Sequence, residues 1–98
     1  YVLTSLTTFS AAMNITDMLQ GNNLAKVIGE VPGNAATCYS NITHFVLPNS
    51  RLSLNVSTSH YYRVDNSNKS IFIMPDIQCE SSKAEYIAIE IITQSKEE

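Results

Sequence analysis

The sequence predicts an α/β fold in which a parallel strand-helix-strand unit is followed by a β-hairpin and a C-terminal helix. Apolar runs at 1–3 and 25–29 flank residues 10–20, whose apolar side chains recur at helical spacing. Two β-forming runs within 42–57 are separated by Pro-Asn-Ser, which is a hairpin signal. The last stretch, 82–98, carries an apolar helical face.

Ser10 lies where the first predicted strand gives way to the helix. The connection between the two apolar runs exceeds the dozen or so residues that a parallel crossover needs, so the strands should be parallel neighbours. Ligands of such sheets bind at the edge where strands end and helices begin, because free N–H groups and the positive end of the helix dipole point there. Small side chains at Ala11 and Ala12 would let a substrate backbone come close. The alternative is that Ser10 is a plain N-cap serine.

The loop 29–34 follows the second predicted strand and should therefore lie at the same edge as Ser10. It contains Gly29, Pro32 and Gly33, so the simplest interpretation is that its glycines serve the turn. The loop has neither a Walker pattern nor a Gly-x-Gly-x-x-Gly motif, and phosphate binding is unsupported.

The hairpin is predicted from strands at 42–47 and 51–57. In the second strand Leu52, Leu54 and Val56 alternate with polar residues, which is the pattern of a half-buried strand. Beyond it, residues 65–68 have the composition of a loop, and a short apolar segment at 71–74 is stopped by Pro-Asp.

The last element has two interpretations. Ser82 and Glu85 form a capping box, and five residues share one helical face: Ala84, Ile87, Ala88, Ile91 and Ile92. The alternation of β-branched Ile87, Ile89 and Ile91 is also typical of a strand. The cap and the charged end of the chain favour the helix.

Composition limits the function classes. The 98 residues form at most one domain, 1–98, with 44% hydrophobic and 15% charged residues, as in ordinary globular proteins. The net charge of −3 and the scattered Lys and Arg residues argue against a nucleic-acid surface. The apolar runs are too short to span a membrane. Because the chain opens directly in a strand, we expect it to be the C-terminal part of a longer protein.

The cysteines and histidines do not form a recognisable site. The spacing of Cys38 and Cys79 matches no zinc or redox motif, so we expect two free thiols, with a disulfide as the alternative. His44 and His60 have no metal ligand at suitable spacing, and surface or half-buried histidines are expected.

The order of four motifs resembles the tail-specific, or C-terminal-processing, serine peptidases, a family that includes the tricorn core and the interphotoreceptor retinoid-binding proteins. The motifs are Thr-x-Ser-x-Ala at 8–12, Val-Ile-Gly-Glu at 27–30 with its glycine turn, Leu-Pro-Asn-Ser at 47–50 and Pro-Asp-Ile at 75–77. The resemblance implies a crotonase- or Clp-protease-like core, no cofactor or metal, and a peptide or protein substrate. It also implies an extracytoplasmic or cell-envelope location in a bacterium.

The resemblance also assigns site residues. It makes Ser10 the nucleophile and the backbone N–H of Ala11 an oxyanion donor, which agrees with the charge at a helix N-terminus. Around them we expect substrate contacts at Thr8, Gly29, Glu30 and Gly33.

The general base is the point at which this chain departs from the family. Ala35 stands where one branch has a lysine, and Lys26 is expected at the opposite edge of the sheet. The tricorn-like branch takes a histidine from an earlier segment and an acid from a place where this chain has Lys69, with Asp65 the nearest carboxylate. We therefore expect the base in the upstream part of the same polypeptide and no activity in this chain alone. The alternative is a non-catalytic binding module of the same fold.

Overall fold

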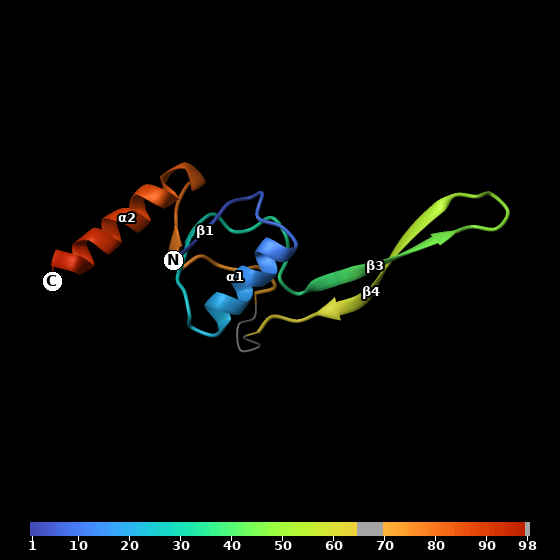
Figure 1. The fold of residues 1–98 in the computed structure, drawn as a ribbon, viewed down its shortest axis with the longest axis horizontal. Helices are drawn as coiled ribbons and strands as arrows, with labels where there is room; N and C mark the ends of the chain where they lie inside the picture. The colour runs from blue at the N-terminus through green and yellow to red at the C-terminus, as the bar shows by residue number, and fades with distance from the viewer. Residues whose placement is uncertain (65–69, 98) are drawn as a thin grey trace.

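The computed structural model describes residues 1–64 and 70–97. A small α/β body lies in the middle of the molecule, and a hairpin and the C-terminal helix extend from it in opposite directions (Figure 1). The extents are 68 × 29 × 18 Å and the radius of gyration is 17.5 Å, whereas a compact domain of this length would have about 13 Å. The two extensions account for the elongation.

The body is built on a three-stranded parallel sheet. Its strands are β1 (Val2–Thr4), β2 (Val27–Gly29) and β5 (Ile77–Gln78), in the order β1-β2-β5. Helix α1 (Ala11–Gly21) connects β1 to β2. The predicted parallel strand-helix-strand unit is therefore confirmed. Strand β5 was not predicted because two residues are too few for a periodic pattern.

The Pro-Asp motif fastens the start of this sheet. An oxygen of the Asp76 carboxylate accepts the Val27 N–H at 2.7 Å and the side-chain amide of Gln20 at 3.2 Å. The same amide donates to the Met74 carbonyl at 2.9 Å. Asp76 therefore satisfies the first N–H of β2 and holds the C-terminal end of α1.

Two apolar clusters form the core. One joins α1 to segments that lie between β2 and β5 in the chain and consists of Met13, Ala36, Ile73 and Cys38. The other lies between the sheet and helix α2 (Ser81–Glu97) and consists of Ile28, Ile77, Cys79, Ala84, Ile87, Ala88 and Ile91. The two cysteines lie in different clusters and both are free, which confirms the prediction of unpaired thiols.

The C-terminal helix is confirmed, but the predicted capping box is wrong. Helix α2 begins at Ser81, so Ser82 lies inside its first turn. The carboxylate of Glu30 accepts the Ser81 N–H at 3.3 Å, so a residue far away in sequence satisfies an N–H at the helix start. Ile92, which was expected on the packed face, is 41% exposed.

The hairpin is confirmed and is longer than predicted. Strands β3 (Cys38–Val46) and β4 (Ser53–Tyr61) pair antiparallel from Cys38 and Tyr61 to Val46 and Ser53, and the ladder skips Asn41, where φ is 60°. The prediction that the second strand is half-buried is wrong, because Leu54 and Val56 are 47% and 43% exposed. The hairpin projects away from the body, and no described helix or strand covers either face of its outer half (Figure 1).

A buried ion pair holds the base of the hairpin. After β4, the Nε of Arg63 lies 3.0 Å from Oδ1 of Asp17 in α1, and both residues are buried. The other Asp17 oxygen accepts the Val64 N–H at 2.9 Å. The Arg63 Nη1 donates to the carbonyls of Phe72 and Ser70 at 2.9 and 3.2 Å. The end of β4 is thereby tied to α1.

Candidate active site

A compact loop at residues 5–9 carries the chain from β1 to Ser10. The Ser5 N–H donates to the hydroxyl oxygen of Thr8 at 3.0 Å, and the Thr8 N–H donates back to the Ser5 carbonyl at 3.0 Å. Thr8 thus holds the loop together at the edge where β1 ends. Its predicted contact with a substrate stays a prediction.

Ser10 has an unusual backbone conformation. Its φ is 54° and its ψ is −121°, a region that residues with a side chain rarely adopt and that costs on the order of 1–3 kcal/mol. The Ser10 carbonyl accepts the Asn14 N–H at 2.9 Å, so the residue stands at the N-cap position. Its side chain makes no capping hydrogen bond and is exposed. The plain N-cap interpretation therefore does not explain this serine.

The first N–H of α1 is available beside the serine. No described residue accepts a hydrogen bond from the Ala11 N–H, which lies at the positive end of the helix dipole. The first turn of α1 also has no acidic side chain to compete for it. The position has the properties expected of an oxyanion donor.

The loop 29–34 lies against the loop that leads to Ser10. A Cβ at Gly29, where φ is 138°, would lie 2.1 Å from the Thr4 carbonyl oxygen. A Cβ at Gly33 would lie 2.4 Å from the Leu6 carbonyl oxygen and 2.8 Å from the Phe9 ring. Both glycines are therefore needed for the close approach of the two loops. Their predicted contacts with a substrate are untested.

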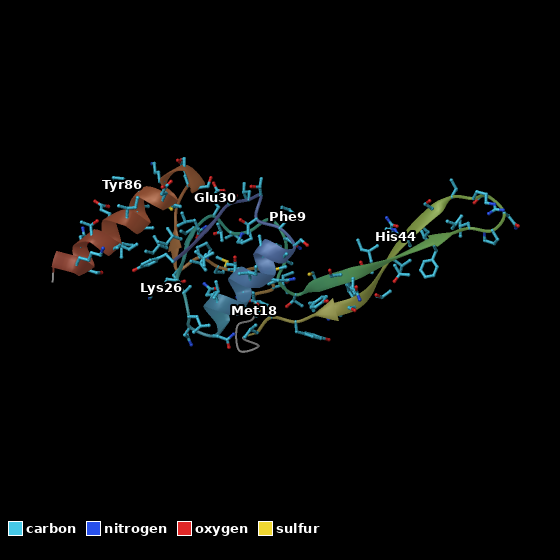
Figure 2. The ribbon with its side chains drawn as sticks, in the orientation of Figure 1. Phe9, Met18, Lys26, Glu30, His44 and Tyr86 are labelled. Carbon is cyan, nitrogen blue, oxygen red and sulfur yellow. The ribbon has the colours of Figure 1, made fainter. Side chains whose placement is uncertain are left out.

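Glu30 joins three segments at this edge. Its Oε2 accepts the Leu6 N–H at 3.0 Å and its Oε1 accepts the Ser81 N–H at 3.3 Å. Figure 2 shows Glu30 and Phe9 at the upper side of the body. A shallow hollow of about 360 Å³ lies beside Glu30, lined by Leu6, Glu30, Val31, Gln78, Cys79 and Glu80.

The histidines lie on the hairpin and away from this edge. The Nδ1 of His44 is hydrogen-bonded to the side chain of Asn55 on the neighbouring strand, and Figure 2 shows His44 about midway along the hairpin, away from the body. His60 lies between the rings of Tyr39 and Tyr62, with ring centroids 4.5 and 4.4 Å away. Both histidines are exposed, as predicted.

The remaining candidate bases also lie elsewhere. Lys26 precedes β2 and lines a pocket with Tyr1 and Asp76 at the edge where the strands begin, as predicted. Ala35 has no amine, and Asp65 lies outside the described residues. Within 1–64 and 70–97, no three His, Cys, Asp or Glu side chains gather as metal ligands. In the same ranges, no helix is long and apolar enough to cross a membrane.

Asn34 was missed by the sequence analysis. Its Oδ1 accepts the Ser10 N–H at 3.0 Å, so the loop 29–34 reaches the serine itself and the expectation of a shared edge is confirmed. The one available signal was an amide side chain directly after Gly33, in the loop already placed at that edge.

An exposed serine in a strained turn between a strand and a helix, next to a free helix N–H, is the arrangement in which serine hydrolases present a nucleophile. The family model of peptidase family S41 matches residues 1–79, and the chain therefore belongs to this family. The resemblance to the C-terminal-processing peptidases is thus confirmed at the level of the family. No curated protein and no solved structure matches the chain.

Proposed function

We propose that this chain is the nucleophile-bearing part of a serine endopeptidase of the tail-specific type. The observation that carries the proposal is the backbone of Ser10, held at φ 54° and ψ −121° with an exposed hydroxyl that has no partner in the described part of the chain. Strain of this kind is kept where function requires it. Membership of peptidase family S41 supports a peptide or protein substrate.

In this mechanism the Ser10 Oγ attacks the carbonyl carbon of the scissile peptide bond. The negative oxygen that forms is stabilised by the Ala11 N–H and the positive end of α1. A base takes the hydroxyl proton and passes it to the leaving amine as the C–N bond breaks and the acyl-enzyme forms. Water then releases the acyl group.

The base is supplied by the upstream part of the same polypeptide. This part of the proposal is supported by the Ser10 hydroxyl, which has no hydrogen-bond partner among the described residues. A serine without a base is a weak nucleophile at neutral pH, so the chain alone is expected to be inactive towards casein or a fluorogenic peptide. Turnover by the chain that Ser10→Ala abolishes would contradict this.

The finer assignments belong to the same proposal. The body is the C-terminal portion of a crotonase-like core, and 1–98 is a single domain of a longer peptidase. Asp65 is the candidate acid, and the substrate passes Thr8, Gly29, Glu30 and Gly33. An extracytoplasmic or cell-envelope location also remains a prediction. The support for these assignments is the order of the motifs at 8–12, 27–30, 47–50 and 75–77.

The experiment compares Ser10→Ala with Ser57→Ala in the full-length parent. Ser57 is an exposed serine of β4 and serves as the matched control. We expect Ser10→Ala to lower kcat by at least about 10³-fold and to abolish labelling by a fluorophosphonate, whereas Ser57→Ala should change neither. Equal cleavage by Ser10→Ala and the unmodified parent would show that the assignment is wrong.

A second candidate function is a non-catalytic binding module. It is favoured by the positions of His44, His60 and Lys26, none of which the described structure brings to Ser10. A parent that neither cleaves peptides nor reacts with a fluorophosphonate, yet binds an extended peptide in a pull-down, would support this alternative.

A further inference from the structure

We infer that Asn34 is a positioning residue for the Ser10 nucleophile. Its carboxamide oxygen holds the Ser10 N–H, so that the serine keeps its strained backbone and the Ala11 N–H remains the oxyanion donor. The inference rests on the proposed function of Ser10. The chemistry assigned to Asn34 is that of a neutral hydrogen-bond acceptor that touches neither substrate nor reacting atoms.

Hydrogen bonds hold the Ser10 backbone on both sides. Its carbonyl is engaged by the first turn of α1 through the Asn14 N–H at 2.9 Å. Its N–H is engaged by Asn34 at 3.0 Å, across 24 residues of sequence. Among the described residues, Asn34 is the sole hydrogen-bond partner of Ser10 that lies outside α1 and its own turn. Without it, the rare conformation would depend on the helix alone.

Asn34 is itself held in place by its neighbours. It follows Gly33, which lies so close to the Leu6 carbonyl and the Phe9 ring that no side chain fits there. Its Nδ2 donates to the Ala35 carbonyl at 3.3 Å. Because the amide nitrogen is used in this way, the oxygen is the atom that faces Ser10.

An oxyanion at this site needs a free backbone N–H beside the nucleophile. A serine nucleophile can offer its own N–H to the developing negative charge, but at Ser10 that N–H is already donated to Asn34. The next N–H, at Ala11, has no partner among the described residues. Asn34 therefore determines which backbone group is free. A neutral amide does this without adding negative charge close to the place where the oxyanion forms.

The experiment uses the full-length parent with Asn34→Ala, Asn34→Asp and a control, Asn22→Ala. The control removes an exposed amide that donates to the Met18 carbonyl at 2.8 Å, at the other end of α1. Three measurements are made: the rate of fluorophosphonate labelling, kcat and KM for a peptide, and hydrogen exchange of the segment containing Ser10.

Asn34→Ala should slow labelling and lower kcat by about tenfold to a hundredfold, with KM within about twofold because the substrate is not contacted. Exchange at the Ser10 segment should become faster, whereas Asn22→Ala should leave all three measurements unchanged. Asn34→Asp keeps an acceptor, so exchange should return to the unmodified rate, but labelling should stay slow because a carboxylate opposes the oxyanion.

The inference is overturned if Asn34→Ala reacts at the rate of the unmodified parent, or if Asn34→Asp exchanges as fast as Asn34→Ala. The two failures are separable. An unmodified parent that is labelled at Ser10 while Asn34→Ala reacts equally fast overturns the positioning role alone. An unmodified parent that is not labelled at Ser10 overturns the proposed function and the catalytic role of Asn34 with it.

Discussion

The body around α1 and the hairpin β3–β4 use polar side chains in different ways. In the body, Asp17, Glu30, Asn34 and Asp76 each accept a backbone N–H from a segment far away in sequence. In the outer half of the hairpin, the polar side chains are exposed, and a side-chain bond such as that of His44 to Asn55 joins only the two paired strands. The backbone at the sheet edge is therefore held by hydrogen bonds between distant segments, whereas the backbone of the hairpin is held by contacts between its own two strands.

Charge separates the two regions as well. The hairpin, 38–61, contains a single formally charged residue, Arg51, which lies in the turn at its tip. Its exposed side chains include large apolar ones, listed here with their exposed fractions: Ile42 59%, Phe45 49%, Leu54 47% and Val56 43%. Strands of this kind have few of the charges that usually protect a sheet edge from pairing with another chain.

The largest loss of stability is expected from a substitution at Gly29, at the edge of the sheet. Alanine there would bring a Cβ to 2.1 Å from the Thr4 carbonyl oxygen at a φ of 138°. We expect Gly29→Ala to lower the free energy of unfolding by about 4 kcal/mol or more, measured by urea unfolding. Gly21→Ala, at the end of α1, is the control and should be neutral or slightly stabilising. Equal stability of the two variants would show that Gly29 does not lie this close to the Thr4 carbonyl.

The next largest loss of stability is expected at the Arg63–Asp17 ion pair, which connects the hairpin to α1. Arg63→Ala leaves the buried Asp17 carboxylate without its positively charged partner, and such changes cost about 3–5 kcal/mol. Arg51→Ala, at the exposed tip, should change the free energy of unfolding by less than about 0.5 kcal/mol. Chemical denaturation of both variants measures the contrast. A small loss for Arg63→Ala would mean that the ion pair does not anchor the hairpin.

A smaller effect is expected at Ser10, where a glycine should stabilise the protein because it relieves the backbone strain. Glycine adopts φ 54° freely, whereas alanine keeps the strain. Ser10→Gly should therefore be more stable than Ser10→Ala by about 1 kcal/mol. In β4, the same comparison at Ser57 should have the opposite sign. Thermal unfolding of the four variants measures the difference in stability between glycine and alanine at each position. If that difference is the same at Ser10 and Ser57, Ser10 is not strained.

The smallest effect is expected on the hairpin. Leu54→Ser replaces an exposed apolar side chain with a polar one, and the free energy of unfolding should change by less than about 0.5 kcal/mol. Ile28→Val removes one methylene from a fully buried residue of the body and should cost about 0.5–1.5 kcal/mol. A larger loss for Leu54→Ser, measured in urea, would show that this face of the hairpin is covered.

The sequence predicted those parts of the fold that depend on near neighbours. Helical spacing and strand-forming runs located α1, β1 and β2, and the turn at 48–50 located the hairpin. Alternation at Leu54 and Val56 identified a shared face but not whether anything covers it. The predicted cap at Ser82 was wrong because the N–H at the start of α2 is satisfied by Glu30, a contact between segments that no local pattern reveals.

The candidate site follows the same rule. Ser10 and Ala11 were found because a strand end and a helix start are local features. The Ser10 N–H donates to Asn34, 24 residues away, and this contact could not be predicted from either segment alone. The motif order indicated peptidase family S41. It did not indicate that Asp76 accepts the Val27 N–H, because this bond forms only where β2 and β5 lie side by side.

Because the hairpin has so few charged residues, the chain could be cleaved once within it and remain associated as two fragments. Between Lys26 and Arg63 the only residue after which trypsin can cut is Arg51, and it lies in the exposed turn at the tip, where Leu47 and Leu52 are bonded across the ends of the strands. A nick there would leave β3 and β4 joined by the whole ladder. The two fragments, 1–51 and 52–98, would each keep one strand with which to recognise the other.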